Sequence, residues 1–205
     1  SRHLLQALDH VEERNRRELE LAAEMQQMLV PKDLPNNGQI MAAGWYQPHH
    51  QVGGDYYDVF STGPDQWVLC VADVSGKGIA AALLMSNFQA SMRALMGRGS
   101  GSLEELIHEL NANVHERARG ERFITLFLGR VDMASGAMEY VNAGHNPPLL
   151  VQPGGEPQEL MEGSIALGML KELPFVQVGR TTIRDSLLLC YTDGLVEQEN
   201  ERGEA

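Results

Sequence analysis

The first thirty residues carry apolar side chains at alternating steps of three and four positions. The stripe consists of Leu4, Leu8, Val11, Asn15, Glu18, Ala22, Met25 and Leu29, and it is polar at Asn15 and Glu18. This spacing gives the 3.5-residue period of a coiled-coil seam, and Pro31 and Pro35 end the segment. The pattern predicts one helix over residues 4–29 that forms a homodimer. Because Leu19, Leu21 and Met28 make competing stripes, the alternative is a helix that packs on its own domain.

After Pro35 the pattern changes to short apolar or alternating runs that are typical of strands. The predicted strands are residues 40–46, 56–60, 67–72, 123–131, 137–142, 148–151, 175–178 and 187–191. Turn signals such as Gly63-Pro64, Ser135-Gly136 and Gly154-Gly155 separate them.

Two predicted helices interrupt the strands. One begins after Gly78 and ends near Met96, and the other covers residues 103–117, where Ser102 and Glu105 provide the residues of a capping box. Strands, two adjacent helices and then more strands predict an α+β fold, a β-sandwich of two antiparallel sheets flanked by helices. We expect two parts, a coiled-coil-like linker helix over residues 1–32 and a domain over residues 33–205.

Composition and charge narrow the function. Hydrophobic residues make up 43% of the chain, enough for a core, and 28 acidic against 16 basic residues give a net charge of −12. Basic residues form no cluster that could neutralise nucleic-acid phosphates. Cys70 and Cys190 lie in apolar runs and are expected to be free thiols, which fits a reducing cytoplasm. No apolar stretch reaches the length of a membrane span, so we expect a cytoplasmic protein.

Three segments place an aspartate beside glycine at the end of a hydrophobic run or turn. They are Gly53-Gly54-Asp55-Tyr56-Tyr57-Asp58, Val71-Ala72-Asp73-Val74-Ser75-Gly76-Lys77-Gly78 and Cys190-Tyr191-Thr192-Asp193-Gly194. Each aspartate by itself could cap a turn or a helix. If the three converge, their charge needs compensation, and hard divalent cations with oxygen ligands supply it. The sequence therefore predicts a site for Mg²⁺ or Mn²⁺.

Five ordered motifs carry a family resemblance. GGDYYDVF, VADVSGKGIAAALLMS, FITLFLGRVD, YVNAGHNPPLL and LLLCYTDGLVE resemble the bacterial phosphatases of the sporulation and stress-response branch of the type 2C superfamily. The resemblance implies a β-sandwich with a binuclear Mn²⁺ or Mg²⁺ centre at one edge. It also implies a phosphoserine or phosphothreonine substrate on a small regulatory protein, such as an anti-sigma-factor antagonist.

The resemblance also implies roles for individual residues. Asp73 would bridge both metals, the Val74 carbonyl would ligate one of them, Asp193 would bind the second and Asp55 the first. Asp58 is a weaker candidate on the same turn. Water activated by the two metals is the expected nucleophile, so no protein nucleophile is needed.

Three further residues are candidates for contacts with the substrate. Ser75 and Lys77 adjoin Asp73 and could contact phosphate, although Lys77 fits a solvent-exposed turn equally well. His145 is either a general acid or part of a structural turn before Pro147.

The sequence departs from the family pattern at its end. A late aspartate that completes the second metal site is missing, and Glu197 and Glu199 lack the expected context. We therefore expect the domain to lack its C-terminal end and to hold at most one metal tightly. The alternative function is a non-catalytic or weakly active switch module of the same fold. The Gly53-Gly54-Asp55 string superficially resembles the signature of diguanylate cyclases, but nothing later in the sequence supports nucleotide cyclisation.

Overall fold

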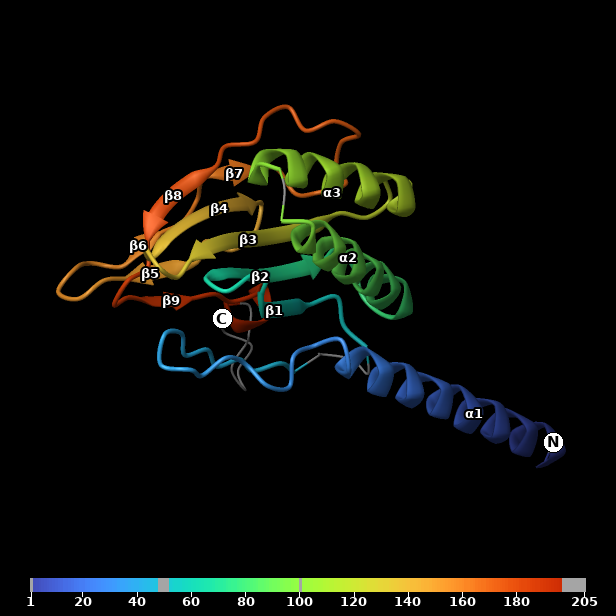
Figure 1. The fold of residues 1–205 in the computed structure, drawn as a ribbon. Coiled ribbons are helices and arrows are strands. Elements are labelled where there is room, and N and C mark those ends of the chain that lie inside the picture. The colour runs from blue at the N-terminus through green and yellow to red at the C-terminus, as the bar shows by residue number, and fades with distance from the viewer. Residues whose placement is uncertain (1, 48–51, 100, 197–205) are drawn as a thin grey trace.

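The structure is a computed structural model that describes residues 2–47, 52–99 and 101–196 (Figure 1). In chain order its elements are α1 (Arg2–Gln27), β1 (Tyr56–Ser61), β2 (Gln66–Val74), α2 (Ile79–Gly97), α3 (Leu103–Ala118), β3 (Ile124–Asp132), β4 (Ala137–Ala143), β5 (Leu149–Val151), β6 (Gln158–Glu159), β7 (Gly163–Ser164), β8 (Gly179–Thr182), β9 (Leu187–Leu189) and α4 (Asp193–Val196).

The strands form two sheets. The larger sheet has the order β1-β2-β3-β4-β7, with β8 also paired to β4, and the smaller one has the order β6-β5-β9. All of these pairings are antiparallel except the short β4–β7 pairing, which is parallel. The predicted α+β fold with two packed sheets is thus confirmed.

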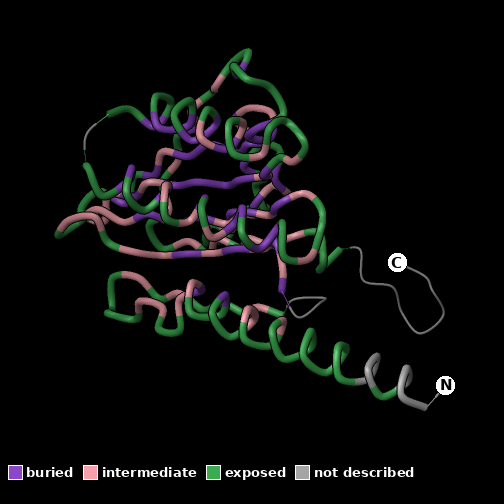
Figure 2. The backbone as a smooth tube through the Cα atoms, turned by 90° about the vertical axis from the view of Figure 1, so that its right-hand side faces the viewer, coloured by how far each residue is buried: buried purple, intermediate pink, exposed green. Residues whose placement is uncertain are grey.

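Opposite faces of the large sheet are covered by different layers. On one face, alternate residues such as Cys70, Leu128 and Val141 pack against Met85 of α2 and Ile107 of α3. On the other face lies the smaller sheet, and this contact buries Phe127, Val131, Met138, Tyr140, Leu150 and Leu160. Figure 2 shows the buried segments concentrated in the central strands between these layers. The alternation of side chains along β2, β3 and β4 supplies both cores.

Helix α1 projects away from the body of the domain for most of its length (Figure 1). Its last turn is attached: the Gln26 side chain donates to the Gly53 carbonyl at 2.6 Å and accepts from the Gly53 amide at 2.9 Å, and Leu29 packs on the core. Farther out, Val11 is 48% exposed. The alternative in which the helix packs on its own domain therefore holds only for the C-terminal turns. The side chains of Leu4 and Leu8 lie outside the described part.

The three long helices, α1, α2 and α3, were predicted to within about two residues, whereas the short α4 was not predicted. Ser102 caps α3 by accepting from the Glu105 amide, and the Glu105 carboxylate accepts from the Ser102 amide in return.

Among the described residues, no helix is both long and apolar enough to cross a membrane.

Two predicted strands are wrong. In residues 40–46 only Met41 pairs, in an isolated bridge with Asn36. The run has no partner strand among the described residues, and its Trp45 is 80% exposed. Residues 175–178 are irregular, and pairing with β4 begins instead at Gly179. There a Cβ atom would lie 2.3 Å from the Tyr140 ring, so the lack of a side chain allows the close approach.

Candidate metal centre

Strand pairing brings the predicted site residues to one edge of the large sheet. Asp73 is the penultimate residue of β2, and Asp55 directly precedes β1, which pairs antiparallel with β2. Asp193 begins α4, more than a hundred residues later in the chain. The Thr192 hydroxyl nevertheless lies 3.4 Å from the Asp55 carboxylate. The fold therefore places all three aspartates in one neighbourhood.

The electrostatics of the three aspartates show their proximity. Burial, together with the negative charges of Asp55 and Asp193, raises the pKa of Asp73 to about 7. Burial is also the main cause of the raised pKa of Asp55, which lies within hydrogen-bonding distance of Asp73. Carboxylates that crowd one another in this way must share a proton or bind a cation. The donor set, made only of oxygen, fits Mg²⁺ or Mn²⁺.

The backbone at Val74 adds a fourth oxygen. The Val74 amide donates to the Gly54 carbonyl at 3.3 Å, which holds the two turns together. A Cβ atom on Gly54 would lie 2.7 Å from the Val74 carbonyl oxygen and 3.2 Å from a carboxylate oxygen of Asp73. Glycine at position 54 thus keeps this carbonyl open beside the carboxylates.

The arrangement is not a complete metal cage. Across the described part of the chain, no three His, Cys, Asp or Glu side chains are close enough together to hold an ion by themselves. Asp193 is exposed, whereas Asp55 and Asp73 are half-buried. The residues present fit one cation near Asp55 and Asp73, and Asp193 lies adjacent as the residue that would hold a second.

We expect Gly54→Ala to weaken Mn²⁺ binding about tenfold, the scale seen when residues that support metal ligands are changed, because its methyl group would crowd the Val74 carbonyl and Asp73. Isothermal titration calorimetry measures this affinity. Gly97→Ala is the matched control, since a Cβ atom there meets nothing within 4 Å. Equal affinities of both variants would contradict the role of Gly54.

The candidates for phosphate contact lie beside this edge. The Ser75 hydroxyl accepts a hydrogen bond from the Phe123 amide at 2.9 Å, which leaves its own hydrogen available. The Arg122 guanidinium donates to the Ser75 carbonyl at 2.9 Å and so fixes the same turn. Lys77 is exposed on this turn.

Asp58 is not part of the site. It is fully buried, and both of its oxygens accept hydrogen bonds from Arg93, at 2.6 and 2.9 Å. Tyr56 also donates to it. Because side chains alternate along β1, Asp58 faces the helices, where the arginine of α2 neutralises it. The weaker metal-ligand candidate is therefore corrected to a structural ion pair.

His145 lies next to the acidic edge but is inaccessible. It is 5% exposed, and burial lowers its pKa to about 4, although the Tyr191 carbonyl and the Asp193 charge oppose this shift. A general acid must be protonated near neutral pH and must reach the leaving group. The general-acid hypothesis is therefore disfavoured.

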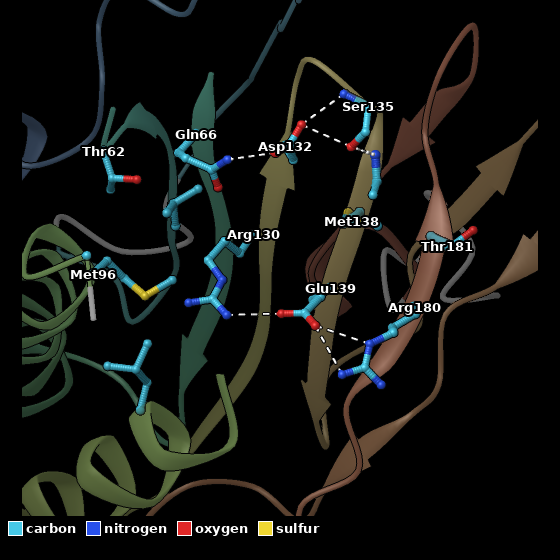
Figure 3. Close-up of a pocket in the computed structure, with 14 residues that line it drawn as sticks. Thr62, Gln66, Met96, Arg130, Asp132, Ser135, Met138, Glu139, Arg180 and Thr181 are labelled. Atoms are coloured by element: carbon cyan, nitrogen blue, oxygen red, sulfur yellow. Dashed lines mark hydrogen bonds and ion pairs between the residues drawn. The ribbon is translucent and has the colours of Figure 1, made fainter. Parts of the chain in front are cut away.

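A pocket of about 680 Å³ lies elsewhere, where β2 begins and β3 ends. Figure 3 shows Glu139 between the guanidinium groups of Arg130 and Arg180. None of the predicted site residues lines it. The acidic edge is at the opposite end of the same strands, so the pocket is separate from the candidate metal centre.

The comparisons with known proteins give the class. The sequence profile of the family "Stage II sporulation protein E (SpoIIE)" matches residues 63–205, so this chain belongs to that family. The solved SiaA-PP2C domain of Pseudomonas aeruginosa superposes with a TM-score of 0.72 over 95% of this chain and 78% of that one, at 19% identity. This likeness shows that the fold is that of type 2C phosphatases.

Several curated proteins are similar in sequence, among them the two that follow. Protein IcfG of Synechocystis is 29% identical over 89% of this chain and 33% of its own length. Phosphoserine phosphatase RsbU of Bacillus subtilis is 28% identical over 97% of this chain and 59% of its own length. The chain thus spans one third to three fifths of these relatives.

Sequence reasoning gave no role to Thr125 and Thr192, whose hydroxyls lie 3.4 Å from the Asp73 carbonyl and 3.4 Å from the Asp55 carboxylate. Thr125 stands opposite Asp73 in the β2–β3 register. No local pattern marks these contacts, since the β2–β3 pairing brings Thr125 to Asp73 and the tertiary fold brings Thr192 to Asp55.

Proposed function

We propose that this chain is a metal-dependent protein serine/threonine phosphatase domain. The observation that carries the proposal is the gathering of Asp55, Asp73 and Asp193, with the Val74 carbonyl, at one sheet edge of a SpoIIE-family chain. Such a group of oxygens needs cations, and phosphate ester hydrolysis needs cations to offset the charge of the phosphoryl group.

Each residue has a distinct part in the proposal. Asp73, which lies near both other aspartates, would be shared by two cations; Asp55 and the Val74 carbonyl would complete the first position and Asp193 the second. When bound, Mn²⁺ or Mg²⁺ lowers the pKa of water and neutralises phosphoryl charge. Lys77 and the free hydrogen of Ser75 would contact the phosphate. No protein nucleophile is required.

The proposed substrate is phosphoserine or phosphothreonine on a small regulatory protein, such as an anti-sigma-factor antagonist. The exposure of Asp193 and Lys77 supports a macromolecular substrate, because the phosphate can reach them from an open surface. RsbU, named a phosphoserine phosphatase, supports the same residue type.

The test is hydrolysis of a phosphoserine peptide with and without Mn²⁺. We expect turnover to rise with Mn²⁺ and to fall to the uncatalysed level with excess chelator, because the aspartates alone repel the phosphate. Phosphate release measures the rate, and restoring Mn²⁺ after chelation is the control for irreversible damage. Activity that is unchanged by the chelator would contradict the metal mechanism.

A second candidate is a non-catalytic or weakly active switch module. The incomplete cluster among the described residues favours it, and residues 197–205, with Glu197 and Glu199, lie outside the described part. Calorimetry separates the two functions. Mn²⁺ binding without turnover supports the switch module, and Mn²⁺ binding with turnover supports the phosphatase.

We also propose that α1 joins two copies of the chain. Val11 is exposed on the predicted seam, and Leu21, 60% exposed, lies off it. Val11→Asp should convert a dimer to a monomer in sedimentation equilibrium, because it buries a charge in the seam. Leu21→Asp should leave the dimer intact. A wild-type chain that is monomeric at high micromolar concentration would show the proposal to be wrong.

A further inference from the structure

The turn after β4 is held firmly from both sides. The Asn142 carboxamide accepts from the His145 amide at 2.8 Å and donates to the Leu160 carbonyl at 3.1 Å. Gly144, at φ +67°, adopts a left-handed conformation in which a Cβ atom would lie 3.1 Å from the Ala166 amide nitrogen. The backbone that carries His145 is therefore fixed without any help from the imidazole.

One nitrogen of the imidazole reaches the metal edge through Thr125. Nδ1 lies 2.9 Å from the Thr125 hydroxyl oxygen, and that hydroxyl lies 3.4 Å from the Asp73 carbonyl oxygen, which it can donate to. The hydroxyl has one hydrogen. If the hydroxyl donates to Nδ1, the ring proton is on Nε2, which is then an N–H donor. If the hydroxyl donates to the carbonyl, Nδ1 carries the proton and Nε2 is an acceptor.

The other imidazole nitrogen, Nε2, is a buried polar atom with unused hydrogen-bonding capacity. Within the described part of the chain, Nε2 has no hydrogen-bond partner, which is uncommon for a buried polar atom. The Tyr191 carbonyl and the Asp193 carboxylate are near enough to the ring to act on its pKa, which both of them raise. These belong to the segment whose aspartate is exposed and, although near Asp55 and Asp73, does not complete a three-residue metal cluster with them.

We propose that His145 is a positioning residue. Its Nδ1 is anchored at Asp73 through Thr125, and its Nε2 forms a hydrogen bond to the segment of Tyr191, Thr192 and Asp193. This bond positions the Asp193 carboxylate next to Asp73. The imidazole thereby links the end of β2 to the start of α4, two parts of the site that no strand pairing joins. The inference rests on the proposed metal centre and adds to it a residue that binds neither metal nor phosphate. Groups that hydrogen-bond to the segment carrying a ligand orient that ligand at metal sites.

Two substitutions separate the two nitrogens. In His145→Asn the carboxamide can reach the place of Nδ1 and keep the Thr125 contact, but nothing occupies the place of Nε2. In His145→Gln the carboxamide reaches the place of Nε2. We expect His145→Asn to lower Mn²⁺ affinity about tenfold and His145→Gln to restore most of it. In an Asp193→Asn background, His145→Asn should cause no further loss.

A second readout uses the metal-free protein. Amide hydrogen exchange at residues 192–195 should be faster in His145→Asn than in wild type and nearly normal in His145→Gln, while exchange in β2 and β3 is unchanged. A role limited to folding the turn predicts the reverse order, with asparagine at least as good as glutamine. That order, or wild-type behaviour of His145→Asn in both measurements, would overturn the proposal.

The outcomes also separate this inference from the proposed function. If the wild type binds no Mn²⁺, the metal mechanism fails, and the exchange measurement still decides the positioning role. If the wild type binds Mn²⁺ and pulsed electron paramagnetic resonance shows a directly bound imidazole nitrogen that His145→Asn removes, then His145 is a ligand and the positioning role is wrong.

Discussion

Asp73→Asn should reduce turnover of a phosphoserine peptide by about 10³-fold, because it removes the carboxylate that lies near both Asp55 and Asp193. Metal ions supply several kcal/mol of charge stabilisation in such reactions, and each 1.36 kcal/mol corresponds to a factor of ten. Initial rates at saturating Mn²⁺ measure the loss. Retention of Mn²⁺ affinity together with loss of turnover would assign Asp73 to the chemistry and not to binding.

The control for this prediction lies at the other end of the same strand. Asp65 is exposed and directly precedes β2, so Asp65→Asn removes the same charge from the chain without touching the acidic edge. We expect its rate to stay within about twofold of wild type, since exposed charges interact weakly across such distances. Full activity of Asp73→Asn, or an equal loss in Asp65→Asn, would contradict the proposed site.

Arg93→Met should lower the free energy of unfolding by about 3 kcal/mol, because it leaves Asp58 as an unpaired buried carboxylate. Arg93 makes two hydrogen bonds to Asp58, and its guanidinium lies 4.5 Å from the centre of the Phe60 ring, a cation–π contact that is lost as well. Urea denaturation followed by circular dichroism measures the difference.

Arg98→Met is the matched control for the ion pair. Arg98 pairs with Glu109 at 3.4 Å, and both side chains are largely exposed, so its replacement should cost within about 0.5 kcal/mol. The double variant Asp58→Asn/Arg93→Met should regain part of the loss, because it removes the unpaired charge. If Arg93→Met and Arg98→Met are equally stable, the buried pair is not the link between α2 and β1 that the structure indicates.

The sequence by itself determined the elements with strong local signals. Helices α2 and α3 follow from apolar faces and, in α3, from the Ser102–Glu105 cap, which acts within one turn of chain. The long strands follow from side-chain alternation. The ordered motifs around Asp55, Asp73 and Asp193 led to the family that the profile match establishes. All of these signals are local, and local chemistry leaves its pattern in the order of residues.

Only the tertiary structure decided which residues meet. Asp58 has the same local setting as Asp55, a glycine turn with tyrosines, yet alternation along β1 turns it to the helices and Arg93. Residues 40–46 have a strand-like pattern but no partner, and β8 starts where Gly179 admits the Tyr140 ring. His145 contacts Thr125 across the sheet. Contacts of this kind depend on strand register and on surfaces far apart in the chain, so no short stretch of sequence contains them.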